Sequence, residues 1–429
     1  MANTTIVPKH IAEAIVSPRA HAEPIERDAL LSGLRYLRAN NPVGLVEAHG
    51  FDPFWLISQH RDVFEVSRKN NHFAYADRPS IVCNREAELA MRAKTGKPYA
   101  VRMLVHMDEP DHLKYRRVIQ SWFTKVRLKA LEADIRTIAR ASVDHMASLG
   151  GRCDFVRDVA LAYPLRVLMK LIGIPPQDEA QMLKLTQEMF GSQDEDLGRN
   201  GAVAAGAAQV RRLDEVFADI EGYFRQLTEE RRLRPIDDLA STIANAQIDG
   251  APIPHFEAFC LYLIVVTAGH ETTSSSTSGA IWGLGENPSE MRKLKARPEL
   301  TDNLVDEAIR WTNPVSHFMR TATEDTNLGG RPIRKGDWLM LSYLSANNDE
   351  TLFDQPERFR VDRDASQHIA FGTGIHACLG QHLANLEMRI LFEELIPRLK
   401  TLELAGEPKR SASTFVGGPK SVPIDFVLR

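Results

Sequence analysis

The chain has 429 residues, of which 43% are hydrophobic and 26% are charged, close to the average of folded globular proteins. Such a composition excludes a disordered chain, a collagen and a coiled-coil rod. With 53 basic and 57 acidic residues the formal net charge is −4. This balance argues against nucleic acid as the main partner, because phosphate binding needs a basic surface.

The hydrophobic segments are too short for a membrane span or the core of a signal peptide. Lys9, Glu13 and Arg19 interrupt the N-terminal region, which therefore lacks a signal-peptide core. The longest strongly apolar stretch, residues 258–269, is shorter than the roughly 20 residues that cross a bilayer. We therefore expect a cytoplasmic protein with no membrane partner.

Hydrophobic periodicity predicts a mainly α fold with a minor β region. Apolar residues recur at spacings of three and four in most of the chain, whereas short apolar runs bounded by Gly or Pro indicate strands. Because neither an internal repeat nor a linker divides the sequence, we expect one large domain over residues 1–429. In chain order we predict a strand at 54–57, helices at 127–146, 210–227, 258–285 and 300–311, a strand at 338–341, a helix at 379–399 and a strand at 422–427.

Residues 191–209 mix acids, glycines and alanines between two helical patterns. The simpler interpretation is a solvated loop. The alternative is a lid over a buried site, because lids come from segments of low local stability.

The middle of the helix at 258–285 breaks the usual helical preferences. Gly269, Thr272 and Thr273 are poor helix formers, and a Thr hydroxyl can bond back to a carbonyl of its own helix. A local rule broken inside a helix marks an expected functional site, with simple packing as the alternative. Ser274 stands where a zinc protease of the HExxH type has its second His, so that class is excluded.

Residues 371–380 form the most informative motif, with the sequence FGTGIHACLG. Gly372 and Gly374 allow the backbone to turn tightly and to approach a flat ligand. Cys378 stands at the start of the helix at 379–399, where the exposed N–H groups favour a thiolate. A thiolate is the axial iron ligand that favours O–O cleavage in haem enzymes. The other cysteines, expected to be reduced buried thiols, are Cys83, Cys153 and Cys260.

The same motif has a rival interpretation as a dinucleotide-binding turn. Gly372, Gly374 and Ala377 spell GxGxxA, which a helix follows. The preceding apolar run, residues 368–371, is short for a strand, and His376 and Cys378 would be unexplained. A nucleotide-dependent dehydrogenase of this kind would bind dinucleotide tightly and be colourless.

Five further segments follow the chain order of one family: TAGHETTSSS, VDEAIRWT, FMRTA, CLGQHLA and FVGGPKSVPI. FGTGIHACLG resembles the haem-binding loop of the cytochrome P450 haem-thiolate monooxygenases, and the five segments are similar to the soluble bacterial branch that includes terpineol-oxidising enzymes. The resemblance implies the P450 fold, a triangular prism of mainly helices. It also implies haem b as cofactor, with O2 and a small hydrophobic substrate that is hydroxylated at a C–H bond. Electrons would come from NAD(P)H through a ferredoxin reductase and a ferredoxin.

The resemblance also assigns roles to residues. Cys378 would ligate the iron, Thr272 would be the alcohol and Glu271 the acid that deliver protons when dioxygen is split. Charge-assisted hydrogen bonds suit the haem propionates. The residues implied at the cofactor are His112, Arg116, Arg320 and His376 on the propionates, with Phe371, Gly372, Gly380 and Ala268 beside the ring.

Glu307 and Arg310 are neighbours at i,i+3 on the helix at 300–311. Such a pair alone is usually a surface salt bridge. The resemblance makes Glu307, Arg310 and Arg358 a buried network that braces the cysteine loop, a role in folding with no chemical step.

The substrate pocket implied by the resemblance is apolar and suits a monoterpenoid or an alkylbenzene. A hydroxyl of Thr267 or Ser316 would orient one polar group, and residues 99–105 would form the roof. Ordinary core packing is the alternative for each position. The implied lining residues are Ile264, Thr267, Ala268, Val315, Ser316, Phe318, Phe415 and Val416.

The segment 114–129 carries six basic residues and no acidic one. A solvated helix face is the default interpretation, but the family's reductase-facing surface includes this region, so we predict that an acidic ferredoxin docks here. A haem-binding sensor is a second alternative function. It would keep Cys378 and be indifferent to Thr272→Ala, whereas a monooxygenase would lose the coupling of electron use to product.

Overall fold

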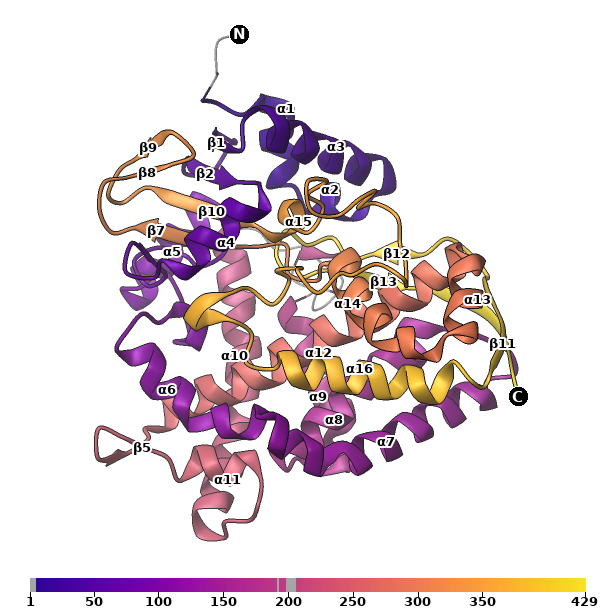
Figure 1. The fold of residues 1–429 in the computed structure, drawn as a ribbon. Helices are drawn as coiled ribbons and strands as arrows, with labels where there is room; N and C mark the ends of the chain where they lie inside the picture. The colour runs from indigo at the N-terminus through magenta and orange to yellow at the C-terminus, as the bar shows by residue number, and fades with distance from the viewer. Residues whose placement is uncertain (1–4, 191–192, 198–205) are drawn as a thin grey trace.

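Helices account for most of the structure, and they form where apolar side chains recur on one face (Figure 1). The computed structural model describes residues 5–190, 193–197 and 206–429. Thr124 caps α7, accepting a hydrogen bond from Arg127 N at 3.4 Å, so this helix begins two residues before its expected start. The helices are α1 (Lys9–Ile15), α2 (Pro18–Ala22), α3 (Pro24–Asn40), α4 (His60–Arg68), α5 (Arg85–Thr95), α6 (Asp111–Gln120), α7 (Lys125–Ser148), α8 (Ala162–Ile172), α9 (Glu179–Phe190), α10 (Gly206–Leu233), α11 (Leu239–Ala244), α12 (His255–Glu286), α13 (Pro288–Ala296), α14 (Thr301–Thr312), α15 (Tyr343–Ala346) and α16 (Gln381–Leu395). Within the described residues, each helix falls short of the length or apolarity needed to cross a membrane.

A five-stranded sheet with the order β1-β2-β10-β7-β3 lies beside the N-terminal helices (Figure 1). All four residues of β2 are buried, as the continuous apolar run predicts. Phe54 and Leu56 pack in a cluster with α1 and α3, and Trp55 and Ile57 pack on the other face with α4. The strands are β1 (Val43–Val46), β2 (Phe54–Ile57), β3 (Phe73–Ala74), β4 (Arg152–Asp154), β5 (Gln247–Ile248), β6 (Ala251–Pro252), β7 (His317–Ala322), β8 (Thr326–Leu328), β9 (Arg331–Ile333), β10 (Trp338–Ser342), β11 (Leu399–Leu404), β12 (Lys409–Arg410), β13 (Pro419–Ser421) and β14 (Pro423–Leu428).

The long helix α12 runs through the middle of the helical region and is buried along most of its length (Figure 1). It packs against α8, α14 and α16. Glycines allow this close approach: a Cβ at Gly269 would come within 3.0 Å of Leu168, and one at Gly283 within 2.5 Å of Phe359. Helix α12 is apolar in its first half, and the small polar side chains from Thr273 to Ser278 are also buried, as expected for a helix in the core.

The predicted loop at 191–209 lies largely outside the described residues. In its described part, the buried Asp194 accepts hydrogen bonds from Lys420 Nζ at 3.0 Å and Ala412 N at 2.7 Å. Gln193 Oε1 accepts from Thr414 N at 3.0 Å. Helix α10 begins at Gly206, so the end of the predicted loop is helical. The lid function stays a prediction.

The dinucleotide-binding interpretation of the cysteine loop is wrong. Between the end of β10 and the start of β11, residues 343–398 form helices and turns and contain no strand, so the βα unit that this motif requires does not exist. The predicted start of the last long helix is also wrong. Helix α16 begins at Gln381 after the N-cap Gly380, and Cys378 therefore precedes the helix instead of opening it.

A buried ionic network centred on Glu307 supports this loop. The Arg310 guanidinium donates two hydrogen bonds to the Glu307 carboxylate, at 2.7 and 2.9 Å, and both side chains are fully buried. Arg310 Nη1 also donates to Asn347 O at 2.8 Å, and Asn347 Oδ1 accepts from Ile369 N at 2.8 Å, two residues before the loop. The network thus connects α14 to the chain that enters the cysteine loop.

The predicted third member of the network, Arg358, is wrong: Arg363 occupies that place. The Arg363 Nε donates to Glu307 Oε1 at 3.1 Å, and the side chain is 6% exposed. The Arg358 side chain is exposed and makes no ion pair among the described residues; only its carbonyl takes part, accepting from Arg363 Nη2 at 3.1 Å. Three arginines lie within six residues, so sequence spacing alone does not distinguish them.

We predict that Arg363→Leu destabilises the protein by about 3–5 kcal/mol, because it leaves the buried Glu307 carboxylate without one of its partners. Arg358→Leu is the matched control and should stay within about 0.5 kcal/mol of the wild type, since its side chain lies in solvent. Urea unfolding of both variants measures the two effects. Equal destabilisation by both substitutions would contradict the assignment.

Candidate functional site

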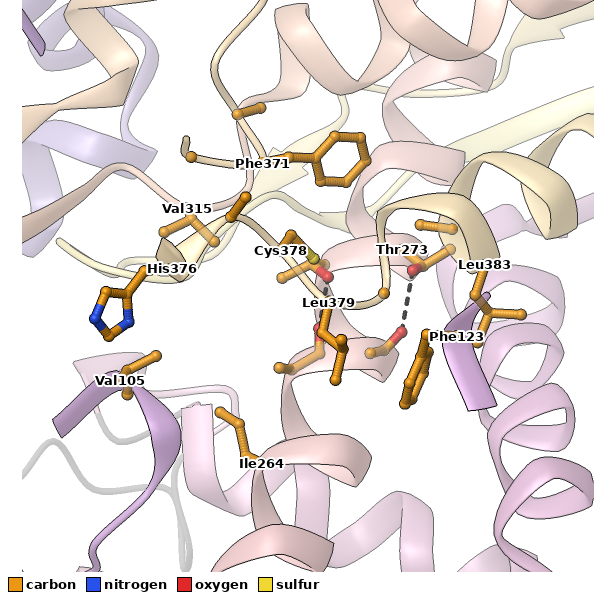
Figure 2. Close-up of a pocket in the computed structure, with 18 of the residues that line it drawn as sticks. Val105, Phe123, Ile264, Thr273, Val315, Phe371, His376, Cys378, Leu379 and Leu383 are labelled. Atoms are coloured by element: carbon orange, nitrogen blue, oxygen red, sulfur yellow. Dashed lines mark hydrogen bonds between the residues drawn. The ribbon is translucent and has the colours of Figure 1, made fainter. Parts of the chain in front are cut away.

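A cavity of about 220 Å³ separates α12 from the cysteine loop. Its wall is mainly apolar. Figure 2 shows Val105 and Ile264 at one end and Phe371 and Cys378 toward the other. Of the residues implied by the resemblance, those that line the cavity are His112, Arg116, Ile264, Ala268, Thr272, Val315, Phe318, Phe371, Gly372, His376, Cys378 and Gly380.

The Cys378 thiol faces this cavity from a sharply turned loop (Figure 2). Gly372 and Gly374 have φ values of 64° and 76°, and a Cβ at Gly374 would come within 2.7 Å of Ser67 O. The turn is closed by a hydrogen bond from Cys378 N to Phe371 O at 2.8 Å. Burial raises the pKa of the Cys378 thiol, while the amides of Gly380 and Gln381 and the Arg116 guanidinium act to lower it. These two amides and the guanidinium are the contacts that favour the thiolate form of this side chain.

Across the cavity, the α12 hydroxyls bond back to their own helix. Thr272 Oγ1 donates to Ala268 O at 2.7 Å, and Thr272 lines the cavity. Glu271 does not line it: its Oε1 lies 3.8 Å from Nδ1 of the fully buried His270. Burial raises the pKa of Glu271 to about 7 and lowers that of His270 to about 4. The carboxyl group is therefore poised to exchange a proton near neutral pH.

Basic groups gather at one side of the cavity without a counter-charge. Arg116 Nη2 donates to Ala377 O at 2.8 Å, and the rings of His112 and His376 lie 4.0 Å apart. Arg320 does not line the cavity itself, but its guanidinium lies 3.3 Å from the ring centroid of Tyr75, which does. Within the described chain Arg116 and Arg320 make no ion pair. Buried atoms without a hydrogen bond include both ring nitrogens of His112, Nε2 of His376 and Nε of Arg320.

Four predicted substrate contacts do not line the cavity. The Thr267 hydroxyl donates to Leu263 O at 2.6 Å and lies outside the cavity wall. Ser316 lines a different, smaller cavity. Val416 is buried opposite Val315 in a β-bridge, with Val315 on the cavity side. Phe415 likewise does not line the cavity, although its ring contacts that of Phe318 with centroids 5.3 Å apart. Of residues 99–105, the predicted roof, Leu104 and Val105 line the cavity.

Tyr75, Thr273 and Glu387 line the cavity without having been predicted. Glu387 is buried with Oε2 unbonded, and burial raises its pKa well above the usual value. Its position was visible in the sequence as an acid between Leu383 and Leu391, at i−4 and i+4 on the core-facing side of a helix. In the sequence, Tyr75 lies far from α12 and from the cysteine loop, in a segment without a motif. Neither spacing nor a motif therefore predicts that it lines the cavity.

The comparisons with known proteins agree with this geometry. Residues 82–424 match the family model Cytochrome P450. The chain is 42% identical over 98% of its length to Cytochrome P450-terp of Pseudomonas sp, covering 98% of that protein. It is 33% identical to linalool 8-monooxygenase of Pseudomonas putida, over 91% of this chain and 94% of that one. The crystal structure of CYP108D1 from Novosphingobium aromaticivorans superposes with a TM-score of 0.90 at 42% identity, covering 99% of this chain and 100% of that chain.

The chain therefore belongs to the cytochrome P450 family, and it is an oxidoreductase of the monooxygenase type. Its fold is the mainly helical P450 fold. Proteins of this family bind haem b through a cysteine thiolate, so haem b is the cofactor.

The residues around the cavity fit this group. Haem b offers a metal for one thiolate and two propionate carboxylates for nearby cations and donors. Of the residues that line the cavity, Cys378 is the cysteine. Beside it lie the basic side chains that make no ion pair in the described part of the chain, Arg116, Arg320, His112 and His376. Burial lowers the pKa of Arg320 to about 9 and that of His112 to about 4. Pairing with two carboxylates would favour the charged forms of these side chains and raise their pKa values again.

We predict that Glu271 makes the stability of the protein depend on pH. Its folded-state pKa is about 7 against a usual value of 4.5, so the folded protein binds more protons than the unfolded chain between these values. Relative to Glu271→Gln, the wild type should lose stability as pH rises from about 4.5 through 7, by at most about 3 kcal/mol. Urea unfolding of both proteins from pH 5 to 8 measures this difference.

Glu286→Gln, which changes an exposed acid on the same helix, should leave the pH profile as in the wild type. A constant difference between wild type and Glu271→Gln across this range would contradict the assigned pKa.

Proposed function

We propose that this enzyme hydroxylates a small, mainly hydrocarbon substrate such as a monoterpenoid, with Cys378 as the iron ligand. The observation that carries the proposal is the single cavity in which the Cys378 thiol, the Thr272 hydroxyl and unpaired basic groups meet. Bound haem b would supply the activation of O2 for insertion of one oxygen atom into a C–H bond. Arg116, Arg320, His112 and His376 would hold its propionates.

The residues of α12 would move protons on the other side of the cavity. Thr272 Oγ1 is the hydroxyl on the cavity wall, and it can give its proton to the reacting oxygen when it releases Ala268 O. Glu271 would restore that proton, because its pKa of about 7 allows it to both lose and take up a proton near neutral pH. Since its carboxylate lies beside His270 and off the wall, the transfer requires a side-chain rotation or a bridging water.

The lining favours a compact apolar substrate. Ile264, Val315 and Phe318 present hydrocarbon surface, and Ala268 adds only a methyl group to the same wall. The predicted polar contacts from Thr267 and Ser316 do not exist, so the wall selects mainly by shape. The names of the relatives, Cytochrome P450-terp and linalool 8-monooxygenase, support a terpenoid substrate.

The basic segment 114–129 would receive an acidic ferredoxin as electron donor, fed from NAD(P)H by a ferredoxin reductase. Two of its six cations are paired, Lys114 with Asp249 and Arg127 with Asp237, each at 2.7 Å. The remaining cations off the cavity, which make no ion pair in the described part of the chain, are Arg117, Lys125 and Lys129. Arg116 joins α6 to the cysteine loop through Ala377 O, so this surface lies next to the loop that carries Cys378.

The assignment of Cys378 is tested by Cys378→Ser. The reduced, carbon monoxide-treated wild type should show the strongly red-shifted Soret band of thiolate-ligated haem, and the variant should lose this band together with turnover. Cys260→Ser is the matched control, because Cys260 is buried on α12 away from the cavity wall. Retention of the band by Cys378→Ser would refute the assignment.

Substrate class is tested by the change in ferric spin state on addition of terpene alcohols and alkylbenzenes. A compact terpene alcohol should give a saturable change, and Ala268→Leu should weaken its binding about tenfold or more by adding bulk to the cavity wall. Thr267→Ala should leave the Kd unchanged, since its hydroxyl lies outside the cavity. Binding of only bulky or charged compounds would contradict the proposed class.

Charge reversal tests the donor surface. Lys125→Glu combined with Lys129→Glu should slow reduction by an acidic ferredoxin about tenfold at low salt, and the difference should shrink at high salt. The control Lys400→Glu changes an exposed lysine outside this segment and should have no such effect. An unchanged reduction rate with unchanged salt dependence would contradict the proposed docking of ferredoxin at this segment.

A further inference from the structure

A second, smaller cavity lies where α2, α3, the end of α14 and the β12–β13 hairpin meet. Its volume of about 10 Å³ leaves room for one occupant of the size of a water molecule. It shares no lining residue with the large cavity. The lining residues are mostly polar: His21, Arg27, Thr312, Asn313, Ser316, Arg410, Ser411, Ser413, Gly417 and Gly418.

Two arginines of this cavity have unused hydrogen-bond donors. Arg27 Nη1 donates to His21 O at 3.1 Å, and Arg410 donates to no protein atom among the described residues. Each guanidinium carries five N–H donors. The Arg410 guanidinium lies 4.7 Å from the ring centroid of Trp282. An aromatic face attracts the charge but offers no lone pair to the N–H groups.

Arg27 and Arg410 are both half-buried, and their positive charges lack a counter-charge in the cavity wall. Within the described part of the chain neither Arg27 nor Arg410 makes an ion pair, and the acids that act on them, Asp28 and Glu286, are exposed. Burial lowers the pKa of Arg27 to about 10 and that of Arg410 well below its usual value, with Arg27 lowering it further by repulsion. His21 adds no charge near neutral pH, because burial lowers its pKa to about 4.

Neutral donors complete the wall. The Ser316 hydroxyl makes no hydrogen bond in the described residues, and Ser413 Oγ accepts from Phe415 N at 3.2 Å, so its own proton is free. A water molecule would fit the space but would leave the two arginine charges of this wall without neutralisation. Sulfate and phosphate, each with four oxygens around a central atom, exceed the space of one water.

We propose that this cavity binds one small monatomic anion, of the size of chloride, between the guanidinium groups of Arg27 and Arg410. The bound anion would connect the N-terminal helices to the turn at 411–418. That turn is joined to the wall of the large cavity by hydrogen bonds from Gly417 N to Pro314 O, at 2.9 Å, and from Ser316 N to Phe415 O, at 2.8 Å. A bound anion therefore stabilises the fold from a site that is separate from the large cavity.

Thermal unfolding of the haem-loaded protein tests this proposal, with sodium chloride exchanged for sodium gluconate at constant ionic strength. Above the Kd, each tenfold increase in chloride should raise Tm by about 1–2 °C. Arg410→Gln should abolish this dependence while keeping the Soret band of the folded enzyme. Arg27→Gln serves the same purpose if the first variant does not fold.

Arg152→Gln is the matched control, since it removes an exposed arginine that pairs with Asp425, and it should keep the wild-type response. Crystals grown in sodium bromide should give an anomalous bromine peak inside the cavity, with none in Arg410→Gln. An equal chloride response in wild type and Arg410→Gln, a sulfate response that Arg410→Gln also abolishes, or the absence of bromine from the cavity would overturn the proposal.

Discussion

Positive charge buried without a protein counter-charge is the constraint on which the main site depends. Arg116 and Arg320 converge on one side of the large cavity with His112 and His376, and several of their nitrogens have no hydrogen bond. A buried cation is unfavourable until it is paired. These cations therefore gain a counter-charge only when an acidic cofactor is bound. Binding of that cofactor stabilises the fold.

The thiol is held in place by polar contacts that do no chemistry. Glu307 joins Arg310 and Arg363, and Arg310 fixes Asn347, whose side chain holds the backbone at Ile369. These contacts join the chain that enters the loop to α14, which packs against α12. A buried carboxylate with several partners has few alternative arrangements, so it fixes the distance between two elements far apart in the sequence.

The sequence predicted what local pattern and motif determine. The residues of β2 and the course of α12 follow from apolar runs, and Cys378 follows from its loop. The errors arise where several equivalent residues compete. Arg358 and Arg363 are both suited to pair with Glu307, and only the path of the chain selects the second.

The direction of a side chain was a further property that the sequence did not determine. Thr272 lines the cavity and Thr267 does not, although both hydroxyls donate to a carbonyl of α12. The site contribution of Tyr75 depends on tertiary contact alone, with its ring 4.0 Å from that of His376.

Val315 and Ser316 show how one extended segment serves two cavities. Neighbouring residues of extended backbone point to opposite sides, so Val315 lines the large cavity while Ser316 lines the small polar one. The alternation explains why Ser316 does not line the large cavity although its neighbour Val315 does. It also means that the wall at Val315 is backed by the turn at 411–418, through the bridge between Val315 and Val416. The two cavities are therefore joined through one short segment, whose backbone is held by hydrogen bonds from Gly417 N to Pro314 O and from Ser316 N to Phe415 O.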